Sequence, residues 1–159
     1  MKLVETTRDN LVRLLNDLRW EDEIELCHSF TPNFRDKFIE ISLNAKEKYF
    51  LSDKNDNPLV VGGVETKKFK KLKIGRVWLI STNHYAKNKL KLAKFIRARI
   101  EDFKKRHDIL FNIIYKSNYS ALKWLTKCGF RVMELNCDDY KLFYYTRGGI
   151  NFDLRYITR

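Results

Sequence analysis

Cysteine, proline and glycine are scarce in this 159-residue chain, which contains three, two and six of them. The three cysteines (Cys27, Cys128 and Cys137) are an odd number, and their spacing fits neither a disulfide framework nor a zinc site. We therefore expect reduced thiols and no metal. No apolar run approaches the ~20 residues that a membrane span needs, and the N-terminus lacks the apolar core of a signal peptide. These absences predict a cytoplasmic protein without a membrane partner.

Apolar and aromatic residues are plentiful by contrast. They make up 44% and 14% of the chain, which is typical of a packed globule and not of a disordered segment. A chain of this length can bury a core without disulfides or metals. We expect one domain over residues 1–147, followed by a polar tail over residues 148–159.

Positive charge is concentrated in the second part of the chain. Residues 1–60 contain 9 Lys and Arg against 12 Asp and Glu, whereas residues 61–159 contain 23 against 8. Their net charges are therefore −3 and +15. This asymmetry suggests that the second part meets an anion, either a phosphorylated small molecule or nucleic acid. Solubility and a Lys-, Asn- and Ile-rich codon bias are the alternative explanation.

The clearest local pattern covers residues 109–130. The apolar run 109–115 predicts a strand buried on both faces. Asn118 then stands where its side chain can cap a helix, and an apolar helical stripe follows it. Gly129 supplies the left-handed residue that ends such a helix, and Phe130 opens the next strand. The segment therefore predicts a βαβ unit.

The remaining elements are predicted from periodicity and turn residues. A strand at 3–6 precedes a helix that Thr6, Thr7 or Asp9 could cap, and residues 20–29 form an acidic helix or an irregular connection. The other predicted elements are a helix at 32–46, strands at 48–52, 59–65 and 75–81 as an antiparallel meander with a basic loop at 67–73, a helix at 88–107, and a closing hairpin of 130–135 with 140–145.

This order of elements is that of the Gcn5-related N-acetyltransferases (GNAT). The segment from Val77 to Thr82 resembles the strand that binds acetyl-CoA in that family, and the segment from Asn118 to Phe130 resembles its second cofactor motif. More narrowly, the chain is similar to GNAT-like proteins of short-tailed bacteriophages. That likeness rests on Trp78–Thr82, on Leu110–Ile113 with Asn118, and on Trp124–Phe130. Some of those relatives are internal virion proteins.

The resemblance implies an α/β (α+β) fold with a mixed central sheet of about seven strands flanked by helices. It implies an acetyl-CoA-dependent N-acyltransferase that acts on an unidentified amine. The alternative is a catalytically degenerate phage protein that binds a virion or host protein. For a phage protein, the location would be the host cytoplasm or the virion.

The same resemblance places the cofactor between two strands that separate after Ile80. The backbone of Ile80 and the side chain of Thr82 would hold the pantetheine arm. The turn at 83–91 would hold the phosphates through Lys87 and Lys89, where the family has glycines. Asn118 and Ser120 would assist.

Catalytic groups are less clearly marked. Glu65 or Ser81 could hold a water that deprotonates the amine, although Glu65 could equally form a rim pair with Arg76. Many relatives carry a tyrosine acid at the position of Leu125. Tyr140 is the candidate replacement, with Tyr119 and Cys128 as further possibilities. All three could instead be packing residues.

The basic segment 67–73 gives a competing signal. Its lysines are interleaved with Phe69, a composition that can bind phosphates and stack a base. Nucleic acid is therefore a possible partner. A solvated turn is the simpler interpretation of the same residues.

Overall fold

The computed structural model describes residues 1–30, 32–136 and 139–150. Its elements are β1 (Lys2–Val4), α1 (Arg8–Leu15), α2 (Trp20–Phe30), α3 (Phe34–Asn44), β2 (Glu47–Ser52), β3 (Pro58–Phe69), β4 (Leu72–Ser81), α4 (Tyr85–Arg106), β5 (Ile109–Tyr115), α5 (Tyr119–Lys127), β6 (Arg131–Glu134), β7 (Tyr140–Thr146) and a 3₁₀ turn at Arg147–Gly149. Cys27 and Cys128 carry free thiols. Cys137 and tail residues 151–159 lie outside the described residues.

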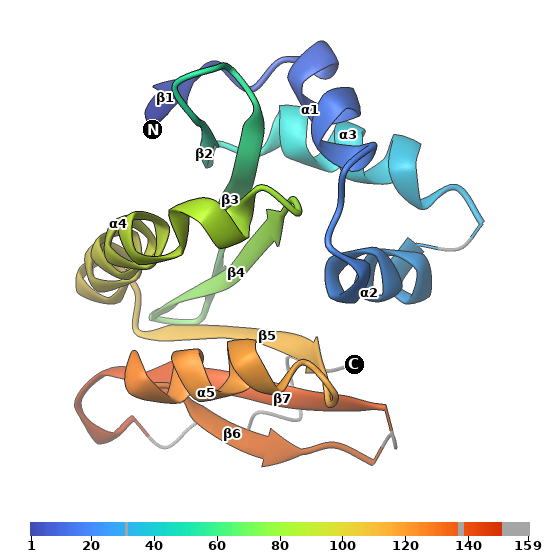
Figure 1. Cartoon of the computed structure of the whole chain (residues 1–159). Coiled ribbons are helices and arrows are strands. Elements are labelled where there is room, and N and C mark those ends of the chain that lie inside the picture. The colour runs from blue at the N-terminus through green and yellow to red at the C-terminus, as the bar shows by residue number, and fades with distance from the viewer. Residues whose placement is uncertain (31, 137–138, 151–159) are drawn as a thin grey trace.

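A single mixed sheet organises the chain, as predicted (Figure 1). Its strand order is β1-β2-β3-β4-β5-β7-β6. The pairing of β4 with β5 is parallel, and the other described pairs are antiparallel. The predicted meander is confirmed as β2, β3 and β4. Within the described residues, no helix is long and apolar enough to cross a membrane.

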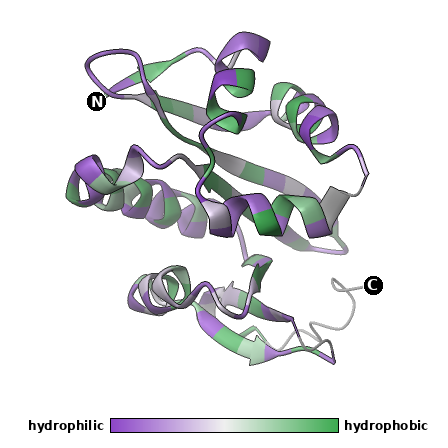
Figure 2. Cartoon of the chain, turned by 45° about the vertical axis from the view of Figure 1, so that its right-hand side comes forward, coloured by the Kyte–Doolittle hydropathy of each residue, from purple (hydrophilic) through white to green (hydrophobic). Residues whose placement is uncertain are grey.

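Successive residues of a strand point to opposite faces of the sheet, and here apolar side chains point to both. Helices therefore cover both faces. Leu51 and Val60 belong to the core beneath α4 and α5, whereas their neighbours Phe50 and Val61 belong to the core beneath α1, α2 and α3. The predicted stripe of α4 is buried in the first of these cores through Leu92, Ile96, Ile100 and Phe103. Figure 2 shows apolar and polar segments alternating along this helix.

The βαβ unit forms as its sequence predicts. Asn118 caps α5, where its Oδ1 accepts the Ala121 N–H at 3.4 Å. Gly129 has a φ of +83°, a backbone region that L side chains rarely adopt, and it ends the helix. Thr7 is the residue that caps α1, through the Asn10 N–H. Residues 20–29, for which two interpretations were open, are helical.

Two local predictions are wrong. Residues 67–73 are not a loop, since β3 and β4 stay paired as far as Phe69 and Leu72 around a two-residue turn. The end of β5 is not buried on both faces either, because Ile113 is 37% exposed. The second difference arises because β5 loses its neighbour β4 halfway along.

Candidate functional site

A wedge opens between β4 and β5. The two strands pair only from Ile74–Arg76 with Ile109–Phe111, so they separate after Arg76, four residues earlier than predicted. Asn112 spans the start of the opening. Its Nδ2 donates to the Val77 carbonyl at 2.7 Å, and its Oδ1 accepts from Arg76 Nε at 3.3 Å. The predicted separation of neighbouring strands is therefore present, with a side chain across its base.

Two pockets meet at this wedge from opposite faces of the sheet. The wedge pocket, about 130 Å³, lies on the side of α4 and α5, and the α3-side pocket, about 100 Å³, lies on the other. Each volume holds only a few non-hydrogen atoms. The residues that line both pockets are Glu25, Trp78, Leu79, Asn112 and Ile113. The two pockets are therefore neighbours on opposite faces of the sheet, with these five residues as common walls.

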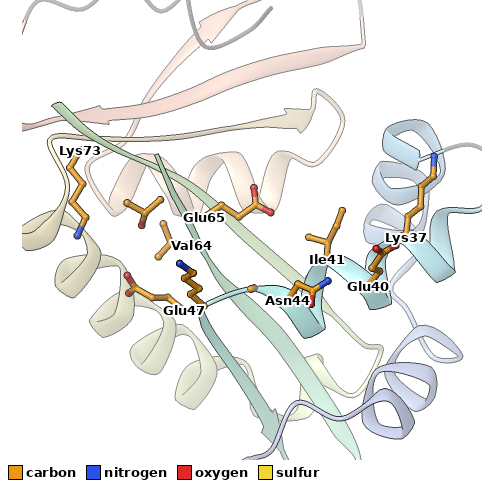
Figure 3. A pocket seen from close by; sticks show the side chains of 11 residues that line it. Lys37, Glu40, Ile41, Asn44, Glu47, Val64, Glu65 and Lys73 are labelled. Carbon is orange, nitrogen blue, oxygen red and sulfur yellow. The ribbon is translucent and has the colours of Figure 1, made fainter. Parts of the chain in front are cut away.

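A larger groove of about 760 Å³ continues from the α3-side pocket. We call it the outer groove. It lies between the end of α3, the start of β2 and the middle of β3, and it meets the α3-side pocket at Ile41 and Glu65, which line both. Figure 3 shows Glu65 reaching across the groove toward α3. A ligand on the α3 side could thus have its body in the outer groove and one end at the wedge.

The backbone that faces the wedge comes from alternate residues of β4. The Thr82 N–H donates to the Leu59 carbonyl of β3, whereas the Val77 carbonyl faces β5 and accepts from Asn112. Because backbone groups alternate in direction along a strand, Val77, Leu79 and Ser81 face the wedge, and Ile80 faces its partner Val61. The backbone of Ile80 therefore does not face the wedge as predicted. The neighbouring residue Leu79 presents its backbone groups there instead.

Helix α2 closes the mouth of the wedge with two carboxylates. Asp22 Oδ2 accepts the Ser81 N–H at 3.0 Å and the Ser81 hydroxyl at 2.6 Å, on the β4 side. Glu25 Oε1 accepts the Tyr115 N–H and Asn118 Nδ2, both at 3.2 Å, on the β5 side. Burial raises the pKa of Asp22 and raises the pKa of Glu25 to about 7. Glu25 is thus a carboxylate that can exchange a proton near neutral pH.

Ser81 and Thr82 are fully buried and engaged within the protein. The Ser81 hydroxyl, besides donating to Asp22, accepts from Arg19 at 3.3 Å. The Thr82 hydroxyl donates to the Pro58 carbonyl at 2.7 Å and joins the end of β4 to the start of β3. Neither hydroxyl is directed at a ligand, which differs from the prediction for both residues.

Glu65 and Tyr140, by contrast, come together with Glu25 on the walls of the α3-side pocket. Glu65 stands opposite Arg76 in the β3–β4 register, but no ion pair joins them. Tyr140 packs edge-on against Tyr115, with ring centroids 5.7 Å apart. The structure therefore brings both residues to the same pocket on the α3 side.

The remaining predicted residues lie around the wedge. Asn118 is buried and lines the wedge pocket. Lys87 and Lys89 are exposed in the first turns of α4, which begins four residues after β4 ends. Ser120 is exposed in the first turn of α5 and does not line any of the three pockets. In Figure 1 the starts of α4 and α5 lie toward the same end of β5 as α2, although α2 covers the opposite face of the sheet.

Sequence reasoning missed Asp22 and Glu25 as functional candidates. Their signal was present in the acidic segment 20–29. Residues three apart in a helix share one face, so a helix over this segment places both carboxylates side by side. What the pattern could not indicate is that this face meets β4 and β5.

Comparison with family models and with curated proteins gives no match for this chain. Solved structures of acetyltransferases share its fold. The GNAT domain of PAT from S. lividans has a TM-score of 0.66 at 10% identity over 91% of this chain and 88% of its own. An acetyltransferase from Bacillus subtilis in complex with CoA has a TM-score of 0.60 at 18% identity over 91% and 96%. A variant of the spermidine N-acetyltransferase SpeG from Vibrio cholerae has a TM-score of 0.57 at 16% identity over 91% of each chain.

Proposed function

We propose that this protein is an acyl-CoA-dependent N-acyltransferase, with acetyl-CoA as donor and a primary amine as acceptor. The observation that carries the proposal is the wedge between β4 and β5, which has a pocket on each face of the sheet and Glu25 on the walls of both. A donor on one face and an acceptor on the other could meet there. The shared fold with an acetyltransferase that binds CoA supports the choice of donor.

The backbone of Leu79 and the side chain of Asn118 would hold the arm of the donor, and Lys87 and Lys89 would face its phosphates. Lysines at a helix N-terminus are disfavoured by the helix dipole, and a bound phosphate would reverse that effect. The donor supplies the acyl group as a thioester. Because the wedge pocket is small, the donor can enter it only if Asp22 and Glu25 release the backbone N–H groups of Ser81 and Tyr115.

On the α3 side, the acceptor nitrogen must lose a proton before it attacks an acyl carbon. Glu25 is the group that takes this proton, since a base with a pKa of about 7 is half ionised at neutral pH. Both hydrogen bonds that it accepts from the described residues end on Oε1, so Oε2 is the oxygen that would take the proton. Glu65 would attract the acceptor ammonium where the outer groove meets the α3-side pocket, and Tyr140 would line its path.

The proposal is tested by thermal unfolding with and without acetyl-CoA. A ligand that binds only the native state raises the melting temperature, so we expect a rise of several degrees at millimolar acetyl-CoA. CoA release is then followed with spermidine as the amine probe, because one structural neighbour is a spermidine N-acetyltransferase. Glu25→Gln should abolish release but keep the thermal shift, whereas Glu5→Gln, at an exposed position that lines none of the three pockets, should preserve both. The absence of a thermal shift would remove the proposal.

A further inference from the structure

The tip of the β3–β4 hairpin is basic and plays no part in the acyl transfer proposed above. We call residues 67–73 the lysine hairpin. It carries Lys67, Lys68, Lys70, Lys71 and Lys73, all of which are exposed except the half-buried Lys73. No salt bridge joins any of the five to an acidic side chain of the described residues. Its charge is therefore available to a partner.

Two features of the lysine hairpin are unfavourable for the isolated protein. Lys68 and Lys73 are directly opposite each other in the strand register, and like charges in such a pair repel. Lys70 has a φ of +53° in the turn, where glycine or asparagine would be more stable. A bound anion would offset the first of these costs. Residues held in strained backbone conformations cluster at functional sites such as ligand clamps.

The surroundings extend the positive surface. The base of the hairpin is held beside the end of α4, where the Asp108 N–H donates to the Lys73 carbonyl at 2.8 Å. The last turn of α4 adds the exposed Lys105 and Arg106, although Arg106 is paired with Glu47 and Asp102. In Figure 1 this end of the sheet lies away from α2 and the mouth of the wedge. Lys73 at the base of the hairpin also lines the outer groove, so the other four lysines and Phe69 are the part of the hairpin that lies outside the proposed acyl-transfer site.

An aromatic ring accompanies the lysines. Phe69 is 41% exposed, and Lys70 Nζ lies 5.7 Å from its ring centroid. Lysines alone would suit any polyanion, but an exposed ring between them suits the flat face of a base. A single strand offers unpaired bases for such stacking, whereas the bases of a duplex are already stacked. The observations thus favour single-stranded nucleic acid over an acidic protein surface.

We propose that the lysine hairpin binds single-stranded nucleic acid through its lysines and Phe69. Binding should be weak and steeply salt-dependent, because few phosphates are contacted and each releases counterions. For three to five contacts on a single strand, the slope of log K against log salt is expected to be roughly −2 to −3.5.

The test measures the fluorescence anisotropy of a labelled twelve-residue oligothymidylate and of a matched RNA at 20 and 200 mM KCl. Lys68→Gln with Lys71→Gln should weaken binding at 20 mM KCl at least tenfold and flatten the salt slope. The matched control, Lys123→Gln with Lys127→Gln, removes the same charge from exposed positions of α5 and should change binding less than threefold. Phe69→Ala should weaken binding without changing the slope. Circular dichroism melts establish that each variant is folded.

Three outcomes would overturn the proposal. One is no binding to either oligonucleotide at 20 mM KCl. Another is an equal loss in the α5 control, which would mean that net charge and not the lysine hairpin attracts the strand. The third is equally tight binding of poly-L-glutamate, unaffected by Phe69→Ala, which would indicate a general polyanion surface. None of these measurements depends on acetyl-CoA, so the two proposals fail separately.

Discussion

Asp22 and Glu25, three residues apart on α2, bind the two separated strands of the sheet from one helix face. Asp22 accepts from the Ser81 N–H of β4, and Glu25 accepts from the Tyr115 N–H of β5. Each carboxylate thus satisfies a backbone donor that lost its strand partner when β4 and β5 diverged. Helix α2 therefore bridges the two strands where they no longer pair with each other.

Burial of Glu25 makes stability depend on pH. Its pKa rises from 4.5 to about 7 on folding, so between these values the native state binds more protons than the unfolded state. The free energy of unfolding should therefore fall as pH rises through this range, by on the order of 2–3 kcal/mol from this group. Urea unfolding of Glu25→Gln across pH 4–8 should show a shallower decline. The exposed Glu40→Gln is the control, and an unchanged slope in Glu25→Gln would contradict the assignment.

The lysines at the start of α4 should lower the stability of the free protein but strengthen the binding of acetyl-CoA. Lys87→Gln with Lys89→Gln removes two cations from the positive end of the helix dipole, which should raise the free energy of unfolding by up to about 1 kcal/mol. The same variant should bind acetyl-CoA more weakly in calorimetry. Lys105→Gln, in the last turn of the same helix, is the control and should be slightly destabilising. Unaltered acetyl-CoA affinity in the double variant would argue against a phosphate role.

Thr82 should affect stability and not ligand binding. Thr82→Val leaves the buried Pro58 carbonyl without its donor at 2.7 Å and should cost about 1–2 kcal/mol. Thr82→Ser keeps the hydroxyl and should recover most of that loss. Denaturant midpoints measure the cost, and calorimetry with acetyl-CoA measures binding. A stable Thr82→Val variant with weakened binding would instead restore the cofactor role that the family resemblance implied.

Asn112 should hold the base of the wedge together. Asn112→Leu preserves the size of the side chain but removes the donor to the Val77 carbonyl, so we expect a loss of about 1–3 kcal/mol. Asn16→Leu, at an exposed position after α1, should change stability by less than about 0.5 kcal/mol. Equal urea midpoints for the two variants would mean that the Asn112 contact contributes little.

The structure brings some of the predicted site residues to the wedge and its pockets and places others elsewhere, and their roles stay predictions. Asn118 caps α5, as one interpretation held, and it also lines the wedge pocket, while its contact with a cofactor stays a prediction. Glu65 and Tyr140 face the same pocket. Ile80, however, faces β3, because one position along a strand reverses the direction of the backbone groups. The phage-type resemblance, the acetyl-CoA donor and a cytoplasmic location stay predictions.

The sequence alone determined the local elements of this protein: the cap at Asn118, the stop at Gly129 and the buried stripe of α4. These signals lie within a few residues of one another, so backbone geometry and helical periodicity are enough to specify them. Only the tertiary structure decided which groups reach the wedge. Ser81 meets Asp22 across 59 residues and Tyr115 meets Glu25 across 90, and such contacts depend on strand register and on the packing of α2, which no local pattern records.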